Sequence, residues 1–450
     1  MSSLLCLGRH TLTGLLTTSG SQFLDWSATY RLFSQQRIPI ADIFSVVRRA
    51  VIEQLPPGAP FCAVIDDTLL RRAGLHVPGV AWRRDPLGPR FQTNFVRAQR
   101  FLQISASMPG KDGSFRLVPI SFLHAPTPPK PKPKPKPSAA VLTQFRRDCH
   151  AARLSLRAAQ QMIQLRNALD LDPGGSQRTL LLAFDGGYTN STVLRQIPPH
   201  TTCIGRIRKD AKLYFSPPPT STKTRGRPLR YGPTAPTPEQ LRTDESQPWQ
   251  TISFNHSGTP HALRYKRALN ILWRTTGVQR LLQLVVIAPL SYRLRKGSKL
   301  LYRDPAFLIC TDQTLEPRQI IETYFQRWDI EVNFREEKTL LGVGQAQVRA
   351  DSSVQSVPAL TVAAYGMLLL STQRAFAKSE AGLLPQPKWA GAAKALRTPT
   401  QQMLHQLRAE VWSRGLGIKN FSDFVADSQS DAKSHKCTFP IAPAAFYANG

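Results

Sequence analysis

Acidic residues are scarce in this sequence. Its 450 residues include 29 Asp and Glu against 59 Lys and Arg, which gives a formal net charge of +30 at pH 7. Such an imbalance indicates a polyanionic partner, with nucleic acid the first candidate and an acidic membrane surface the second. Hydrophobic residues still make up 41% of the chain, so the protein is globular, and its length allows two or three domains.

Clustered cysteines and long apolar runs are also missing. The six cysteines form no Cys-x-x-Cys pair and no cluster with His, which argues against a zinc site and a disulfide framework and favours a reducing cytoplasm. The longest apolar run, residues 359–370, is too short to span a membrane. The first ten residues lack a basic region before their apolar residues, so we expect no signal peptide. We therefore predict a cytoplasmic protein with no membrane partner.

The order of apolar runs predicts an α/β protein with a helical start and a helical end. Residues 1–58 have helical patterns, and strands are expected within 61–68, 97–108, 114–124, 178–188, 201–210, 249–255, 261–274, 280–292 and 306–312. We divide the chain into a helical N-terminal region that is a candidate for binding DNA ends, a core in two parts, a basic loop with a β-rich insertion between those parts, and a helical C-terminal region with a tail. The boundaries are 1–58, 59–210 with 306–375, 211–305 and 376–450.

A Lys-Pro tract interrupts the first part of the core. Residues 126–137 read PTPPKPKPKPKP, and alternating Lys-Pro forms neither a helix nor a central strand, so we expect an extended, charged surface loop. Two roles stay open for it: an inert loop insertion or an added DNA contact. A long helix is expected after it, over residues 141–170.

One expected helix carries an unusual stripe. Pro317 suits its first turn and Gly342 the position just past its end. At about 100° per residue, one side collects a phenol, three cations and a single carboxylate: Tyr324, Arg327, Glu331, Arg335 and Lys338. Asp329 lies about 160° from Glu331 on this wheel, so we expect its replacement to be nearly harmless. The stripe is either a solvated face with ion pairs at helical spacing or a site for a polyanion and a metal ion.

Two further carboxylates are expected at strand ends. Asp66 and Asp185 each close an apolar run, and a carboxylate there commonly binds metal in α/β sheets, although Asp-Asp-Thr and Asp-Gly-Gly are also ordinary turn sequences. If these two side chains converge with Glu331, their repulsion calls for divalent cations. Oxygen ligands without His or Cys favour Mg²⁺, with Mn²⁺ as a substitute. Asp67 is the alternative first ligand.

These residues resemble a known family. Tyr324, Arg327, Glu331 and Lys338 match the Tyr-x2-Arg-x3-Glu-x6-Lys signature of a subgroup of bacterial insertion-sequence DDE transposases, and Asp66-Asp67-Thr68 is similar to the family's Asp-x-Thr motif. The stretch LLAFDGGY at 181–188 is similar to its second acidic motif, and the spacing to Glu331 matches members with a β-rich insertion. The resemblance covers roughly residues 4–375.

The resemblance implies a fold, an activity and partners. The fold is an α/β ribonuclease H-like mixed sheet with flanking helices, in which Asp66, Asp185 and Glu331 bind metal. Tyr324, Arg327 and Lys338 would grip the DNA backbone at transposon ends. The enzyme would cleave element ends and transfer strands to target DNA by two-metal phosphoryl transfer. It would bind terminal inverted repeats and target DNA, pair two ends as a homodimer, and associate with the nucleoid of a bacterium.

Other residues are weaker candidates for DNA binding. Trp273 stacks on an unpaired base or belongs to the core, and Arg225, Arg227 and Arg230 contact phosphates or lie in a solvated loop. Two alternatives to transposition stay open at this point, namely a metal-dependent DNA nuclease without strand transfer and a DNA-binding protein that has lost catalysis.

Overall fold

The computed structural model describes residues 1–74, 76–89, 91–110, 114–218, 229–256, 259–276, 279–295, 297–378 and 397–415. The expectations for Arg225 and Arg227, and for the tail after residue 415, lie outside the described residues.

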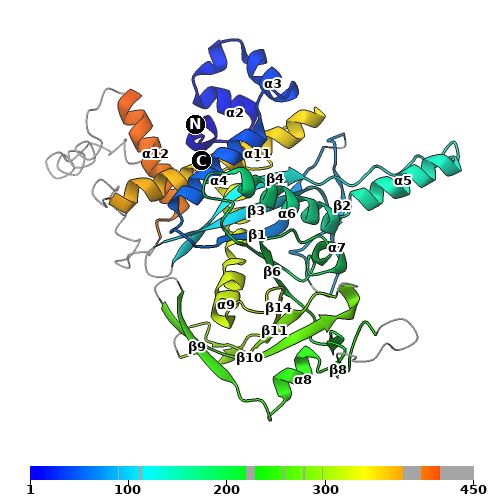
Figure 1. Ribbon diagram of the computed structural model, residues 1–450. Coiled ribbons are helices and arrows are strands. Elements are labelled where there is room, and N and C mark those ends of the chain that lie inside the picture. The colour runs from blue at the N-terminus through cyan, green and yellow to red at the C-terminus, as the bar shows by residue number, and fades with distance from the viewer. Residues whose placement is uncertain are drawn as a thin grey trace.

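A mixed sheet forms the centre of the molecule (Figure 1). Strands β1 (Phe61–Arg71), β5 (Leu180–Phe184) and β6 (Thr201–Arg206) run parallel side by side. Strand β3 (Phe95–Pro109) pairs antiparallel with β1, and β4 (Phe115–His124) pairs antiparallel with β3. The resulting order β4-β3-β1-β5-β6, with helices on both faces, confirms the expected α/β ribonuclease H-like core.

Most strands of the β-rich region continue this sheet, and β12 and β13 form a small sheet of their own. The connection is β14 (Ala306–Cys310), which pairs antiparallel with β6 on one side and with β11 (Leu282–Ile287) on the other. Beyond β11 lie β10 (Thr259–Trp273), then β9 (Gln250–His256), β7 (Leu213–Phe215) and β8 (Thr234–Ala235). Strand β2 (Ala81–Arg84) pairs with β3, and β12 (Ser291–Tyr292) pairs only with β13 (Leu301–Tyr302).

Helices cover the two faces of the central strands unequally. Alternate residues of a strand point to opposite faces, and Phe61, Ala63 and Ile65 belong to the large core cluster that also contains residues of α4 (Ile40–Gln54), α6 (Leu154–Leu171) and α11 (Asp351–Lys378). On the other face, Val64 and Ala183 pack with Ile330 and Phe334 of α10 (Asp329–Thr339). Helix α9 (Pro317–Gln326) contacts β5 and β6.

Helix α11 is the described segment that is long and apolar enough to cross a membrane. In the 18-residue stretch of α11 that meets this test, 78% of the residues are buried inside the protein. The helix packs on α4 and β4. Its composition is therefore accounted for by its position in the core.

The remaining helices lie at the periphery. They are α1 (Ser2–Leu5), α2 (Leu12–Thr18), α3 (Trp26–Ser34), α5 (Ala139–Ala151), α7 (Ser191–Leu194), α8 (Pro238–Thr243) and α12 (Thr400–Gly415). The single long helix expected over residues 141–170 is wrong, since α5 ends at Ala151 and α6 begins at Leu154. The Lys-Pro tract forms neither helix nor strand and bends at residues 133–135, and its four lysines are exposed. Helix α5 projects from the body (Figure 1) and has no buried residue.

Candidate active site

The register of β1 against β5 places two acidic residues side by side. The last parallel pair is Ile65 with Phe184, so Asp66 and Asp185 occupy the next position on each strand. Neighbouring strands lie about 4.8 Å apart, and the charge of Asp185 acts on Asp66 strongly enough to raise its pKa. These two side chains are neighbours at the point where the parallel pairing ends.

Strand alternation also decides which face they share. Asp66 follows Val64 by two positions and Asp185 follows Ala183 by two, and both apolar residues pack against α10. Asp66 therefore points to the α10 face, whereas Asp67 belongs to the opposite set. Asp67 instead accepts a hydrogen bond from the Tyr188 hydroxyl at 2.8 Å and pairs with Arg100 at 3.3 Å.

One expectation about Asp66 is wrong in detail. The sequence predicted a strand that ends at the acids, yet β1 continues to Arg71 because β3 keeps pairing with it beyond Asp66. Only the parallel pairing with β5 stops there. Asp66 thus lies in the middle of β1, beside the position where the neighbouring strand β5 ends.

The stripe-bearing helix is likewise not continuous. Helix α9 ends at Gln326 and α10 begins at Asp329. Across the junction the backbone N–H groups of Arg327, Trp328, Ile330 and Glu331 bond to carbonyls three residues earlier, a 3₁₀ pattern. Tyr324 and Glu331 therefore lie on different helices, and a wheel drawn through both describes their relation only roughly.

Arg327, at this junction, bridges two of the acids. Its Nη1 lies 3.5 Å from Asp66 Oδ2 and 3.6 Å from Glu331 Oε1. The Arg327 side chain is 9% exposed and that of Glu331 is 49% exposed. A buried cation therefore links the carboxylate of Asp66 on β1 to the more exposed carboxylate of Glu331 on α10. Its guanidinium also lies 5.2 Å from the Trp328 ring and 5.8 Å from the Tyr324 ring.

Burial dominates the electrostatics of Asp66. It raises the pKa of the Asp66 carboxyl to about 7, the charge of Asp185 adds to the rise, and Arg327 opposes it. Burial also raises the pKa of Asp67, against the hydrogen bond from Tyr188. A carboxyl whose pKa is raised by burial and by a neighbouring carboxylate is typical of functional sites that bind a cation.

Asp185 satisfies the turn interpretation as well. Its Oδ1 accepts hydrogen bonds from the backbone N–H groups of Gly187 at 2.8 Å and Tyr188 at 3.3 Å. Asp-Gly-Gly is thus an ordinary Asx-type turn that also fixes the carboxylate next to Asp66. The two interpretations of the sequence are compatible.

The remaining stripe residues differ in exposure. Tyr324 and Arg327 are buried at 8% exposure, Arg335 is exposed, and Lys338 is half-buried with its Nζ 5.9 Å from the Phe334 ring centre. Burial lowers the pKa of Lys338, and the charge of Glu337 opposes this shift. Arg327 thus lies at the carboxylates, whereas Tyr324 packs in an apolar cluster with Ile320 and Ile321 and contacts Arg327. Arg335 is the most exposed cation of the stripe.

A basic cavity of about 1180 Å³ adjoins Asp185, since Gly186 lines it. Trp273 also lines it while packing against the core, and its stacking on an unpaired base stays a prediction. Arg208 pairs with Asp210 and Arg242 with Glu239 on the wall. The wall also carries Arg206, Lys209, Lys212 and Arg303. Arg230 is exposed and lies outside this lining.

The donor set suits a hard divalent cation, although the carboxylates are not closed around one. Among the described residues, no three His, Cys, Asp or Glu side chains lie close enough together to form a ready metal site. The guanidinium of Arg327 lies between Asp66 and Glu331 and supplies the positive charge there. Carboxylate oxygens that attract a cation fit Mg²⁺ or Mn²⁺ in chemistry.

Comparison with known proteins identifies the family. A family model described as DDE superfamily endonuclease matches residues 2–277. The chain belongs to this family. Enzymes of the superfamily cleave nucleic acid and use divalent metals, so DNA is the substrate class. The matched segment contains Asp66 and Asp185 but ends before Glu331, and no curated protein matches the chain.

Proposed function

We propose that this DDE enzyme is a transposase of the Tyr-Arg-Glu-Lys subgroup, which cleaves the ends of an insertion sequence and joins them to target DNA. The observation that supports the proposal is the position of Arg327 between Asp66 and Glu331. The β1–β5 register places Asp185 beside Asp66.

Asp66, Asp185 and Glu331 would hold the metal ions, with Mg²⁺ as the cofactor and Mn²⁺ as a substitute. Bound divalent ions activate a water or a 3′-hydroxyl and stabilise the leaving oxygen at a phosphodiester. Two features of the chain prepare this site. Asp66 sits on a strand paired on both sides, and Asp185 is held by its turn. The engagement of Asp67 by Tyr188 and Arg100 favours Asp66 as the first ligand.

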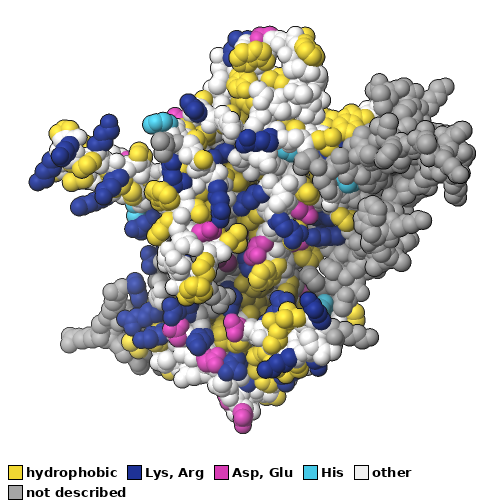
Figure 2. Space-filling view, turned by 180° about the vertical axis from the view of Figure 1, so that it is seen from behind, with side chains coloured by type: hydrophobic (Ala, Val, Ile, Leu, Met, Phe, Trp, Pro, Cys, Tyr) yellow, Lys and Arg dark blue, Asp and Glu magenta, His cyan; other side chains and the backbone are white. Residues whose placement is uncertain are grey.

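DNA would approach from the side on which Glu331 is exposed. Arg335 and Lys338 lie on the same helix and would contact backbone phosphates, and Arg327 and Tyr324 would act beside the carboxylates. Trp273 and the basic cavity wall would receive a base and its phosphate next to Asp185. Figure 2 shows Lys and Arg side chains spread widely over one face and along the projecting α5 region, which supports a long DNA path. Two copies of the chain would pair two ends.

A joining assay separates transposition from simple hydrolysis. The protein is given a pre-cut element end with a free 3′-hydroxyl, a supercoiled target plasmid and Mg²⁺. Covalent end–target products are expected, and they must disappear when the end carries a 3′-deoxy terminus. Cleavage of intact ends without joined product would favour a nuclease, and neither activity with DNA binding retained would favour a lapsed enzyme.

A further inference from the structure

Helix α10 carries a second polar stripe, on the side opposite Glu331. With Glu331 at zero and about 100° per residue, Asp329 lies near 160°, Asn333 near −160° and Glu336 near 140°. Asp329 and Asn333 are buried at 9% and 2% exposure. A helix with polar side chains on its inner side needs partners for them, and the structure supplies these from three separate elements.

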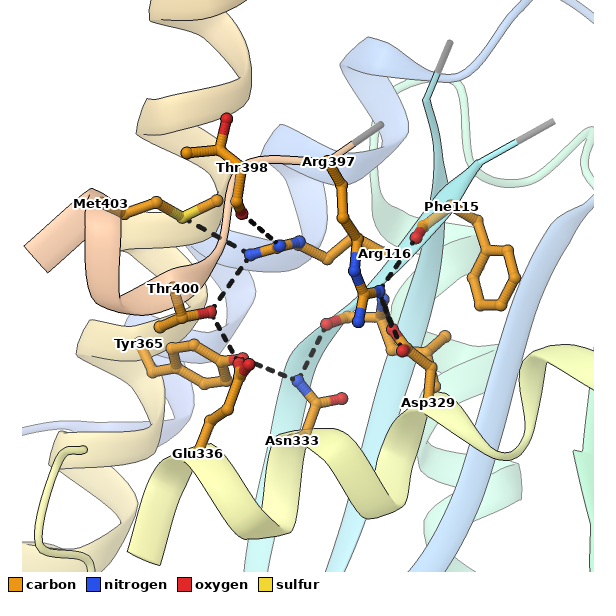
Figure 3. Close-up of polar contacts among 11 residues, drawn as sticks. Phe115, Arg116, Asp329, Asn333, Glu336, Tyr365, Arg397, Thr398, Thr400 and Met403 are labelled. Carbon is orange, nitrogen blue, oxygen red and sulfur yellow. Dashed lines mark hydrogen bonds and ion pairs between the residues drawn. The ribbon is translucent and has the colours of Figure 1, made fainter. Parts of the chain in front are cut away.

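The first partner is the segment that leads into α12. Arg397 Nη1 lies 2.8 Å and 2.9 Å from the two carboxylate oxygens of Asp329, and it also donates to the Phe115 carbonyl at 3.3 Å (Figure 3). The backbone N–H of Leu117 donates to Asp329 Oδ2 at 3.2 Å. The Asp329 side chain is only 11% exposed, so Arg397 is the counter-ion of a largely buried carboxylate.

The other two polar side chains of the stripe, Asn333 and Glu336, form hydrogen bonds in the same region. Asn333 donates to the Leu117 carbonyl at 3.0 Å, and Glu336 Oε2 accepts from Tyr365 at 2.5 Å and from Thr400 at 2.6 Å (Figure 3). Arg116 of β4 then holds the incoming segment itself, through the Thr398 carbonyl at 2.7 Å and the Thr400 hydroxyl at 3.3 Å.

The 3₁₀ junction explains why α10 needs such anchors. Because α9 and α10 are separate helices, the placement of α9 on β5 and β6 does not fix the direction of α10. The side of α10 with Ile330 and Phe334 rests on apolar side chains of the sheet, which permit sliding more readily than directional bonds do. The polar stripe fixes both the rotation and the position of the helix.

We infer that Arg397 is a positioning residue, which holds the buried side of α10 so that Glu331 on the opposite side is presented to Asp66 and Asp185. The inference rests on the proposed function, since it assigns Glu331 to the site. It also means that residues 397–400, which begin 66 positions after Glu331 in sequence, support the active site from the buried side of α10.

The test compares Arg397→Ala with Arg374→Ala. Arg374 also pairs with an acid, Glu53, but on an exposed part of α11 with side chains 54% and 66% exposed, so it controls for the loss of an arginine. For Arg397→Ala we expect cleavage of an element end to fall about 10- to 100-fold, with the Kd for that DNA within about twofold of the parent. Arg397→Lys, which keeps the charge, should recover part of the rate.

Two measurements need no activity. Amide hydrogen exchange in residues 327–336 should become faster in Arg397→Ala and stay unchanged in Arg374→Ala, while exchange in β5 stays slow in both. The Mg²⁺ concentration that half-saturates the metal-induced rise in Tm should increase several-fold in Arg397→Ala, because a misplaced Glu331 weakens the site. Adding Asp329→Asn to Arg397→Ala should change the exchange rates and the Mg²⁺ midpoint little further, because both substitutions break the same ion pair.

Other results would overturn the inference. Unchanged exchange and an unchanged Mg²⁺ midpoint would mean that Arg397 does not position α10. Equal losses of cleavage, DNA binding and Tm with an unchanged Mg²⁺ midpoint would assign Arg397 to general stability. A Glu331→Gln protein that still cleaves would instead overturn the proposed third ligand, and because the exchange measurement does not use catalysis, the two failures are distinguishable.

Discussion

The guanidinium of Arg327 lies 3.5 Å from the carboxylate of Asp66. The same nitrogen is 3.6 Å from Glu331, so one buried cation neutralises two acids that are proposed to bind metal. In the free protein Arg327 therefore has a local role beyond the DNA contact that the signature implies.

The first prediction concerns this cation. Arg327→Gln should lower Tm in the presence of a chelator, because Asp66 and Glu331 lose their shared counter-ion. Saturating Mg²⁺ should restore a large part of the lost Tm, because the bound ion supplies positive charge in the same place. Thermal melts with and without Mg²⁺ measure both effects. Arg335→Gln, an exposed arginine on α10, is the control and should melt like the parent. A deficit of equal size with and without Mg²⁺ would contradict the prediction.

The second prediction concerns the third carboxylate. Glu331→Gln should abolish cleavage and joining while DNA binding survives, since Gln keeps the size of Glu but loses the charge that a hard cation requires. The helical wheel suggests Asp329→Asn as a nearly harmless control. This choice is wrong, because Asp329 is buried and paired with Arg397. Glu322→Gln is a better control, since Glu322 is partly exposed and pairs with Arg318 one helical turn away. The measurements are Mg²⁺-dependent cleavage and separate DNA binding, and residual cutting by Glu331→Gln would remove Glu331 from the site.

The sequence predicted the strands at Asp66 and Asp185 better than the surroundings of these acids. Apolar runs located β1 and β5, and the turn chemistry of Asp-Gly-Gly located Asp185, because both signals are local. The break between α9 and α10 carries no Gly or Pro, so local sequence does not reveal it. Arg397, which pairs with Asp329, and Thr400, which donates to Glu336, each lie more than 60 positions from their partner. Polar residues at i, i+4 and i+7 were a usable signal for a buried polar face, but only the fold identifies their partners.

The third prediction concerns DNA binding. A net charge of +30 should make the affinity for DNA fall steeply as salt rises, because each phosphate contact releases counterions. Lys338→Ala should weaken cleavage, leave the fold intact and reduce the slope of log K against log salt by about 1. Titrations from low to moderate salt measure the slope, with Arg374→Ala as a control that also removes one positive charge. An unchanged slope with normal cleavage would mean that Lys338, half-buried against Phe334, is only a structural charge.

The last prediction uses a buried acid outside the proposed site. Glu337 of α10 is 1% exposed, and its Oε1 has no hydrogen-bond partner among the residues that the structure describes. Burial raises the pKa of its carboxyl to about 8, against a side-chain hydrogen bond with Gln103. Gln103 of β3 is itself fully buried, with its Oε1 also unpaired, so a protonated Glu337 has an acceptor close by. The folded protein thus retains this proton at pH values where the unfolded chain has lost it.

The sign of the effect on stability follows from that difference. Between the ordinary Glu pKa, about 4.5, and the folded value, about 8, the folded state binds one more proton than the unfolded state. The free energy of unfolding should therefore fall as pH rises through this window, by up to about 1.4 kcal/mol per pH unit from this group. Glu337→Gln removes the titration and can still donate a hydrogen bond, so its stability relative to the parent should increase steadily from pH 5 to pH 8. Urea unfolding at several pH values measures this difference, and the exposed Glu53→Gln should show no such trend. A constant difference between parent and Glu337→Gln across the window would mean that Glu337 is ionised in the folded protein.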